Sequence, residues 1–147
     1  MPAAASEPGA PLDPGLAGGL SARVDLVVAD ADTAVALGSG DVAVLATPRL
    51  VALCEEASCR ALAGVLGPGR TSVATRIQFD HLAPVAVGAT VSAEATLERV
   101  VGRRLVFTLS ANVSSDRGAG LVGAGRLTRV LVDRATFLAK AGAATPG

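Results

Sequence analysis

Between residues 70 and 133, apolar and polar residues alternate with a period of two. The stretch 104–114 shows this most clearly, because its odd positions are apolar and most residues between them are polar: Leu105, Phe107, Leu109, Ala111 and Val113. Such alternation indicates β-strands with one buried and one exposed face. Turn-forming residues divide the region into four long strands, at about 72–80, 90–100, 104–114 and 121–133. Strands joined by short turns favour an antiparallel meander.

The stretch 47–66 has helical periodicity. Thr47 is a suitable N-cap, Pro48 suits the first helical position, and Gly67-Pro68-Gly69 would end the helix. One broad apolar stripe is predicted, made of Leu50, Leu53, Cys54, Ala57, Ala61 and Val65. Glu55 projects at the edge of this apolar sector rather than with the exposed charges. A carboxylate placed there belongs to an interface, a pocket or a salt bridge.

The remaining elements complete one domain. We expect a half-buried strand at 22–28 and a short helical end at 134–144, while 33–37 is equally compatible with strand and helix. A flexible leader is expected at 1–20, the domain at 21–140 and a flexible tail at 141–147. One apolar helix before an antiparallel sheet predicts an α+β domain with the sheet wrapped around a central helix, the layout of the hot-dog fold. Pairing across a two-fold axis would close the exposed sheet edges.

Composition excludes several classes of function. Thirteen basic and 13 acidic residues balance, and without a basic run or an aromatic platform nucleic-acid binding is not expected. No apolar run is long enough to span a membrane, and the N-terminal stretch lacks signal-peptide features. Cys54 and Cys59 point in different directions on a helix and cannot form a disulfide within it, so a reducing, cytoplasmic location is the default.

Few side chains suggest chemistry. His81 is the single histidine and follows a predicted strand, although a solvated loop imidazole is also a reasonable interpretation. Glu55 could be catalytic or could simply lie at the helix rim, and Thr47 could be a plain N-cap or could also serve an oxyanion site. With one histidine, no CxxC pair and no glycine-rich phosphate loop, we expect no metal and no cofactor.

Taken together, these residues resemble hot-dog acyl-CoA thioesterases of the fluoroacetyl-CoA thioesterase kind. The resemblance lies in four runs: 46–57, 79–84, 100–105 and 123–130. It implies an acyl-CoA substrate, a homodimer or dimer of dimers, and Thr47, Glu55 and His81 as the catalytic set. It also implies that Arg129 lies on the substrate side, and that Ala74 replaces a small oxyanion-side glycine. Asp41 stands where that family has a lid phenylalanine, so we expect a general short or medium acyl-CoA rather than fluoroacetyl-CoA.

The expected mechanism carries a geometric condition. Glu55 would activate water or attack the thioester, His81 would act as acid and base, and Thr47 would bind a reacting group. If Thr47 begins a continuous helix, Glu55 lies about 12 Å further along its axis. Either the regular helix then begins after Thr47, or the set is completed across a dimer. A hot-dog dehydratase or hydratase and a non-catalytic acyl-CoA-binding module are the alternative functions.

Overall fold

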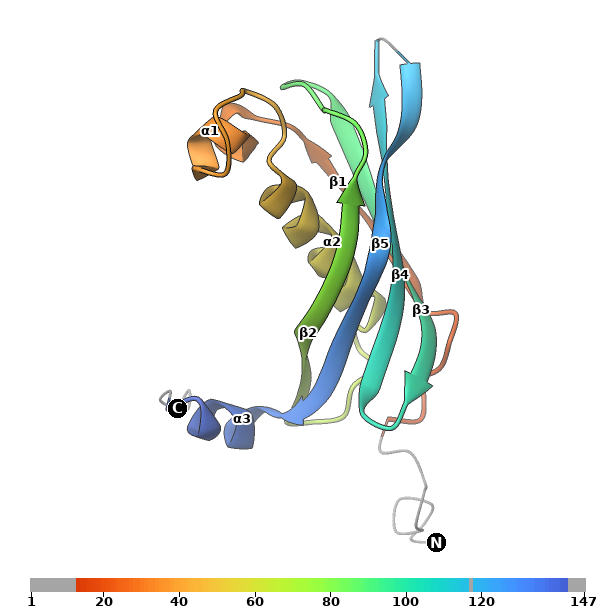
Figure 1. Cartoon of the computed structure of the whole chain (residues 1–147). Helices are drawn as coiled ribbons and strands as arrows, with labels where there is room; N and C mark the ends of the chain where they lie inside the picture. The colour runs from red at the N-terminus through yellow and green to blue at the C-terminus, as the bar shows by residue number, and fades with distance from the viewer. Residues whose placement is uncertain (1–12, 117, 143–147) are drawn as a thin grey trace, which may run out of the picture.

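The computed structural model describes residues 13–116 and 118–142. In this part of the chain, five strands form one antiparallel sheet in the order β1-β3-β4-β5-β2 (Figure 1). The elements in chain order are β1 (Ser21–Val27), the 3-10 turn η2 (Asp30–Asp32), α1 (Ala34–Leu37), α2 (Thr47–Ala61), β2 (Arg70–His81), β3 (Thr90–Val101), β4 (Arg104–Ser115), β5 (Gly118–Asp133) and α3 (Arg134–Lys140). The predicted meander is confirmed, with β1 and β2 at the two edges.

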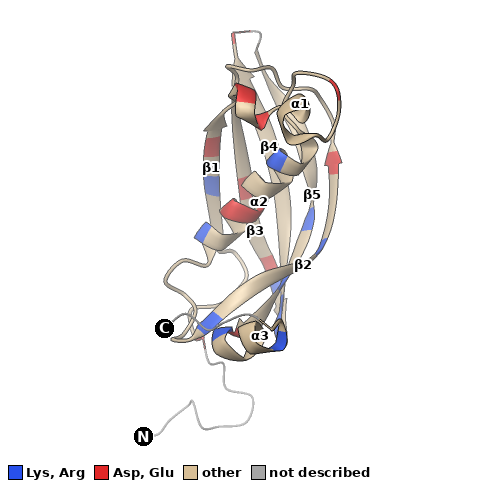
Figure 2. Ribbon diagram, turned by 90° about the vertical axis from the view of Figure 1, so that its left-hand side faces the viewer, with Lys and Arg blue, Asp and Glu red and all other residues tan. Residues whose placement is uncertain are grey.

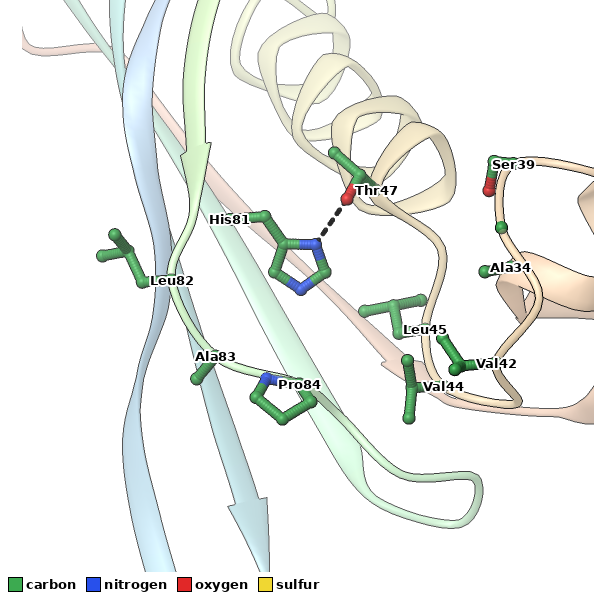
Figure 3. A pocket seen from close by; sticks show the side chains of 11 residues that line it. Ala34, Ser39, Val42, Val44, Leu45, Thr47, His81, Leu82, Ala83 and Pro84 are labelled. Atoms are coloured by element: carbon green, nitrogen blue, oxygen red, sulfur yellow. Dashed lines mark hydrogen bonds between the residues drawn. The ribbon is translucent and has the colours of Figure 1, made fainter.

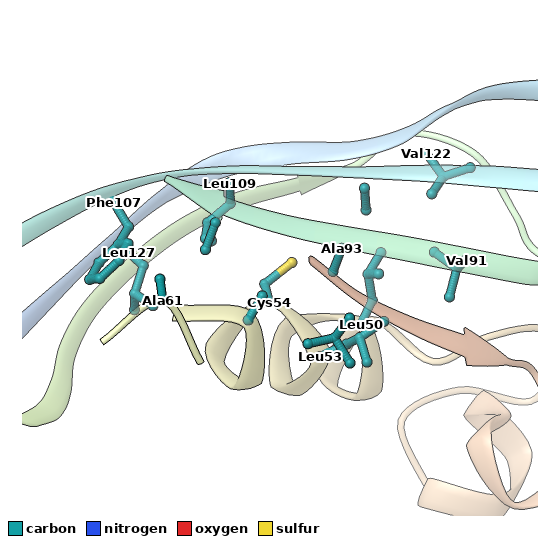
Figure 4. Close-up of a cluster of buried hydrophobic side chains, with 14 of the residues drawn as sticks. Leu50, Leu53, Cys54, Ala61, Val91, Ala93, Phe107, Leu109, Val122 and Leu127 are labelled. Atoms are coloured by element: carbon teal, nitrogen blue, oxygen red, sulfur yellow. The ribbon is translucent and has the colours of Figure 1, made fainter. Parts of the chain in front are cut away.

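The core lies between α2 and the concave face of the sheet (Figures 1 and 4). The predicted helix stripe is buried from Leu50 to Ala61. It packs chiefly on β3 and β1. The sheet contributes alternate residues of β3 and β4, which are fully buried: Val91, Ala93, Ala95, Leu97, Leu105, Phe107, Leu109 and Ala111. Period-two alternation therefore identified the buried face of these strands correctly, because successive side chains point to opposite faces.

Helix α2 differs from its prediction at both ends. Ala46 is the N-cap, with its carbonyl accepting from the Leu50 N–H at 3.0 Å, and Thr47 is the first helical residue. The predicted C-terminal end at residue 66 is wrong, because the helix ends at Ala61 and a tight turn follows. The N–H of Leu62 donates to a carbonyl only three residues back, and Gly64 adopts a φ of +75° that favours glycine.

The undecided stretch 33–37 contains a short helix. The side chain of Thr33 caps α1 by accepting from the Ala36 N–H at 3.2 Å, which settles the local conformation in favour of helix. Part of the expected leader is also structured: Asp13 is buried and its carboxylate lies 3.0 Å from Nε of Arg70. Residues 1–12 and 143–147, the rest of the expected leader and most of the expected tail, lie outside the described residues.

Strand β5 allows the C-terminal end of β2 to approach it closely. Gly125 pairs with Phe79, and a Cβ at this glycine would lie 2.1 Å from the carbonyl oxygen of Gln78. Only a residue without a side chain fits at this position. The close approach fixes the path of β2 two residues before His81.

Strand β2 is one of the two edges of the sheet. Its central residues 74–78 are exposed, and a β-bulge lies between Ala74 and Arg76. An exposed edge of this length offers unpaired backbone groups to another strand. None of the described helices combines the length and apolarity needed to cross a membrane.

Candidate active site

Thr47 and His81 meet where α2 begins and β2 ends. The Thr47 hydroxyl lies 2.7 Å from Nδ1 of His81, although the two residues are 34 positions apart in sequence (Figure 3). Because Ala46 rather than Thr47 is the helix cap, the hydroxyl is not occupied by a capping hydrogen bond. The helix start therefore provides a partner that fixes the orientation of the imidazole ring.

The second ring nitrogen of His81 faces a pocket. Nε2 is buried and makes no hydrogen bond to any residue that the structure describes. If the Thr47 hydroxyl donates to Nδ1, then Nε2 carries the proton; in the other tautomer Nε2 accepts. In either state, Nε2 is the imidazole nitrogen that the described residues leave without a partner, as a nitrogen that serves in general acid–base catalysis must be.

The pocket has a volume of about 340 Å³ and mostly apolar walls (Figure 3). Its polar side chains are those of Thr47, His81 and Ser39. The other lining residues come from α1, from the segment leading to α2 and from the end of β2: Ala34, Gly40, Val42, Val44, Leu45, Leu82, Ala83 and Pro84. Apolar walls with a few polar groups are typical of a small-molecule site.

Glu55 lies apart from this pair within the same chain. Helix α2 is continuous from Thr47, so Glu55 is about 12 Å further along its axis and is not among the pocket-lining residues. Its side chain is 40% exposed, and its Oε1 lies 4.0 Å from Nη1 of Arg129. The first of the two geometric alternatives, a helix beginning after Thr47, is therefore wrong.

Arg129 is buried beneath α2 and firmly held. Its Nε donates to the Ser72 hydroxyl at 2.7 Å and its Nη2 to the Ser72 carbonyl at 2.9 Å. Its Nη1 lies 3.4 Å from the hydroxyl of Ser58 and faces Glu55. A guanidinium fixed in this way supplies a permanent positive charge beside the Glu55 carboxylate.

Several structural positions were not foreseen from the sequence. Ser58 and Ser72 hold Arg129. The sequence feature that could have indicated this role is the position of Ser58 on the buried face of α2. Ser39 lines the pocket from the glycine-flanked segment before α2. Ala74, expected on the substrate side, is exposed at the β2 bulge and does not line the pocket of this chain.

Cys54 is not suited to be a nucleophile. Burial, and secondarily the negative charge of Glu55, raises the pKa of its thiol to about 12. The thiol is therefore neutral at physiological pH and packs as a small apolar side chain in the core (Figure 4).

Comparison with known proteins gives consistent matches to one family. Residues 28–135 match the family model described as fluoroacetyl-CoA-specific thioesterase. A fluoroacetyl-CoA thioesterase from Streptantibioticus cattleyicolor is 38% identical over 103 residues, 70% of this chain and 71% of that protein. A variant of the fluoroacetyl-CoA-specific thioesterase, solved with fluoroacetate and CoA, is 31% identical with a TM-score of 0.73, covering 83% of this chain and 99% of that one.

The fold extends to more distant proteins. A hot-dog-like protein from Thermanaerovibrio acidaminovorans superposes with a TM-score of 0.75 at 24% identity, covering 85% of this chain and 90% of that one. At this identity the likeness shows the fold alone. The predicted α+β hot-dog fold is confirmed.

Proposed function

The chain belongs to the fluoroacetyl-CoA-specific thioesterase family and is a thioester hydrolase, and from this premise we propose that it cleaves a short or medium acyl-CoA into the free acid and CoA, using Thr47, Glu55 and His81. The observation that carries the proposal is the Thr47–His81 hydrogen bond at an apolar pocket into which Nε2 of the imidazole faces.

In the proposed reaction, the thioester carbonyl lies near the start of α2. The Glu55 carboxylate activates a water molecule, whose oxygen bonds to the carbonyl carbon while the proton moves to Glu55. The backbone N–H groups of Thr47 and Arg49, which precede the first hydrogen bond of the helix from Leu50 to Ala46, would stabilise the oxyanion, whereas Pro48 has no N–H. The carbon–sulfur bond then breaks, and the departing thiolate takes the Nε2 proton of His81 in its imidazolium form, whose Nδ1–H donates to the Thr47 hydroxyl; the proton taken up by Glu55 then returns to the ring through water. Thr47 holds the ring throughout.

Direct attack by Glu55 on the carbonyl carbon is the second route. It would form a mixed anhydride and release CoA before water enters. Trapping of an acyl-enzyme, or incorporation of ¹⁸O from labelled water into the Glu55 carboxylate after one turnover, would distinguish it from water activation.

We propose that Glu55 acts on the Thr47–His81 pair of a second copy of the chain. Two observations support this. The same-chain separation is about 12 Å along the helix, and the exposed edge strand β2 carries Ala74, which pairs with Arg129, the residue beside Glu55. Pairing of two β2 edges would create a homodimer with two such sites. The acidic positions midway along α2 are visible on its exposed side (Figure 2).

A subunit-mixing experiment tests this arrangement. Chains carrying Glu55→Gln and chains carrying His81→Ala should each be inactive. If the site spans two copies, co-refolding the two variants restores thiol release, because mixed dimers contain one intact site. If both groups must come from the same chain, mixing restores nothing.

The absence of the lid phenylalanine supports a general acyl-CoA substrate. Asp41 occupies that place in an exposed loop whose neighbours Gly40 and Val42 line the pocket. A charged, exposed side chain would not close over a small fluorinated acyl group as an aromatic ring could.

The domain limits of 21–140 and a cytoplasmic location also stay predictions.

Release of free thiol from a panel of acyl-CoAs is the direct test. His81→Ala should lower kcat by about 10² to 10⁴, the usual contribution of a general acid or base. Glu55→Gln should be similarly impaired, whereas Glu56→Gln, which alters the neighbouring exposed carboxylate paired with Arg60, should behave as wild type. Equal activity of Glu55→Gln and Glu56→Gln would contradict the assigned role.

A further inference from the structure

A large groove adjoins the Thr47–His81 pocket. It has a volume of about 980 Å³ and lies between the segment connecting β2 to β3 and the β4–β5 hairpin, at the end of the molecule near α1 (Figure 1). The lining comes from residues 83–90 on one side and from described residues between 113 and 122 on the other, with Val44 at the junction. We call this the hairpin groove.

The pocket and the hairpin groove share walls. Val44, Ala83 and Pro84 line both. The two cavities are therefore adjacent, and the hairpin groove lies within reach of a molecule whose thioester is bound beside His81. The groove reaches the upper end of the size range in which proteins bind small ligands, whereas the pocket alone is near the lower end.

The chemistry of the hairpin groove favours a hydrocarbon. Its described lining is mainly Val, Ala and Gly, and its polar side chains are those of Thr90, Ser114, Ser115 and Asp116. Val87 and Leu121, which also line it, are 43% and 49% exposed. Large apolar side chains exposed together indicate a binding surface, because water contact with them is unfavourable.

The charge distribution argues against the CoA nucleotide in this groove. Among the described lining residues there is no Lys or Arg, and Asp116 carries the single charge. Figure 2 shows acidic positions on the β4–β5 hairpin and near α1, whereas basic positions gather mainly toward α3, at the opposite end. Phosphate groups require cations or several N–H donors, so the uncharged acyl end is the part of an acyl-CoA that suits this groove.

We propose that the hairpin groove binds the acyl chain, so that the enzyme prefers medium-chain acyl-CoA over acetyl-CoA. This inference rests on the proposed thioesterase function and narrows its substrate class. The acyl chain would run from the carbonyl carbon past Pro84 and between Val87 and Leu121. Each methylene buried there should increase affinity by up to about fourfold.

Binding of non-hydrolysable S-alkyl thioethers of CoA, measured by titration calorimetry, tests the proposal without requiring catalysis. We expect affinity to rise from S-ethyl-CoA to S-octyl-CoA. Leu121→Asp should weaken S-octyl-CoA at least about tenfold more than S-ethyl-CoA, because it places a carboxylate on the path of the chain. The control is Val101→Asp on the β3–β4 hairpin, 54% exposed and outside the groove, which should change neither affinity.

Three results would overturn the proposal. Affinity could be independent of alkyl length; Leu121→Asp could leave S-octyl-CoA unaffected; or it could weaken both thioethers equally, which would place the shared CoA portion in the groove. Failure of the proposed function is separate: no thiol release from any acyl-CoA would refute hydrolysis without affecting the binding result. Hydrolysis confined to acetyl-CoA, with no length dependence in binding, would refute the groove assignment alone.

Discussion

Replacing Gly125 by alanine tests the close contact between β5 and β2 that places His81. The added Cβ would lie 2.1 Å from the Gln78 carbonyl oxygen and 2.7 Å from the Cα of Phe79. Favourable contacts between carbon atoms begin at about 3.5 Å. Both obstructing groups are backbone, so no side-chain rotation can relieve the clash, and the end of β2 must move away from β5.

The expected loss of stability can be bounded. Forcing an extra methyl group into a closely packed site costs about 1–3 kcal/mol. We expect the upper end, because backbone must move. Gly→Ala also reduces the entropy of the unfolded chain, which offsets about 0.4–1 kcal/mol. A net loss of about 2 kcal/mol should lower Tm by roughly 4–8 °C in a domain of this size.

Denaturant titration and thiol release together provide the assay. The matched control is Gly120→Ala in the same strand, where an added Cβ meets nothing within 4 Å. That variant should be as stable as wild type or slightly more stable. Gly123→Ala should fall between the two, since its Cβ mainly meets the ring of Phe79, which can rotate. Gly125→Ala should also lose activity, because His81 moves away from Thr47.

Equal stability of Gly125→Ala and Gly120→Ala would refute the predicted backbone clash at Gly125. Loss of stability without loss of activity would refute the narrower claim that the close strand contact positions the imidazole.

Four further predictions concern the buried and capping groups. Arg129→Met should lower stability by about 2–4 kcal/mol in denaturant titration, because the Ser72 hydroxyl and carbonyl lose a charged donor; Arg129→Lys should lose less, and equal losses would contradict this. In native protein at neutral pH, a thiol reagent should label exposed Cys59 and not buried Cys54. Since burial raises the Cys54 pKa from 9.0 to about 12, stability should fall as pH rises from 9 toward 12, and Cys54→Ala should flatten this slope. The hydrogen bond from the Thr136 N–H lowers the pKa of Asp133 below its usual 3.8. The contribution of this hydrogen bond to stability is therefore present above pH 3.8 and is lost as the pH falls through the pKa of Asp133 in the folded protein. Protection factors of the α3 amides, which correct exchange for its intrinsic pH dependence, should therefore fall under acid in wild type and already at neutral pH in Asp133→Ala.

Much of the architecture was determined by local sequence patterns. The odd positions of β4, such as Leu105 and Phe107, are buried because alternation in a strand places them on one face. Leu50, Leu53 and Ala57 are buried because helical spacing aligns them. These patterns involve near neighbours in the chain, so they can be read without knowledge of the remote structure. The family resemblance likewise lay in short runs of residues.

Tertiary structure decided how the candidate site is assembled. Thr47 and His81 are 34 residues apart, and their hydrogen bond depends on the close approach of β2 to β5 at Gly125 and on an N-cap of α2 that lies one residue earlier than expected. The separation of Glu55 from this pair also depends on a helix continuous from Thr47. The hairpin groove arises from two segments that no sequence pattern connects. Distances between remote side chains depend on how strands curve and how a helix packs on them, and periodicity in the sequence records only which face each residue occupies.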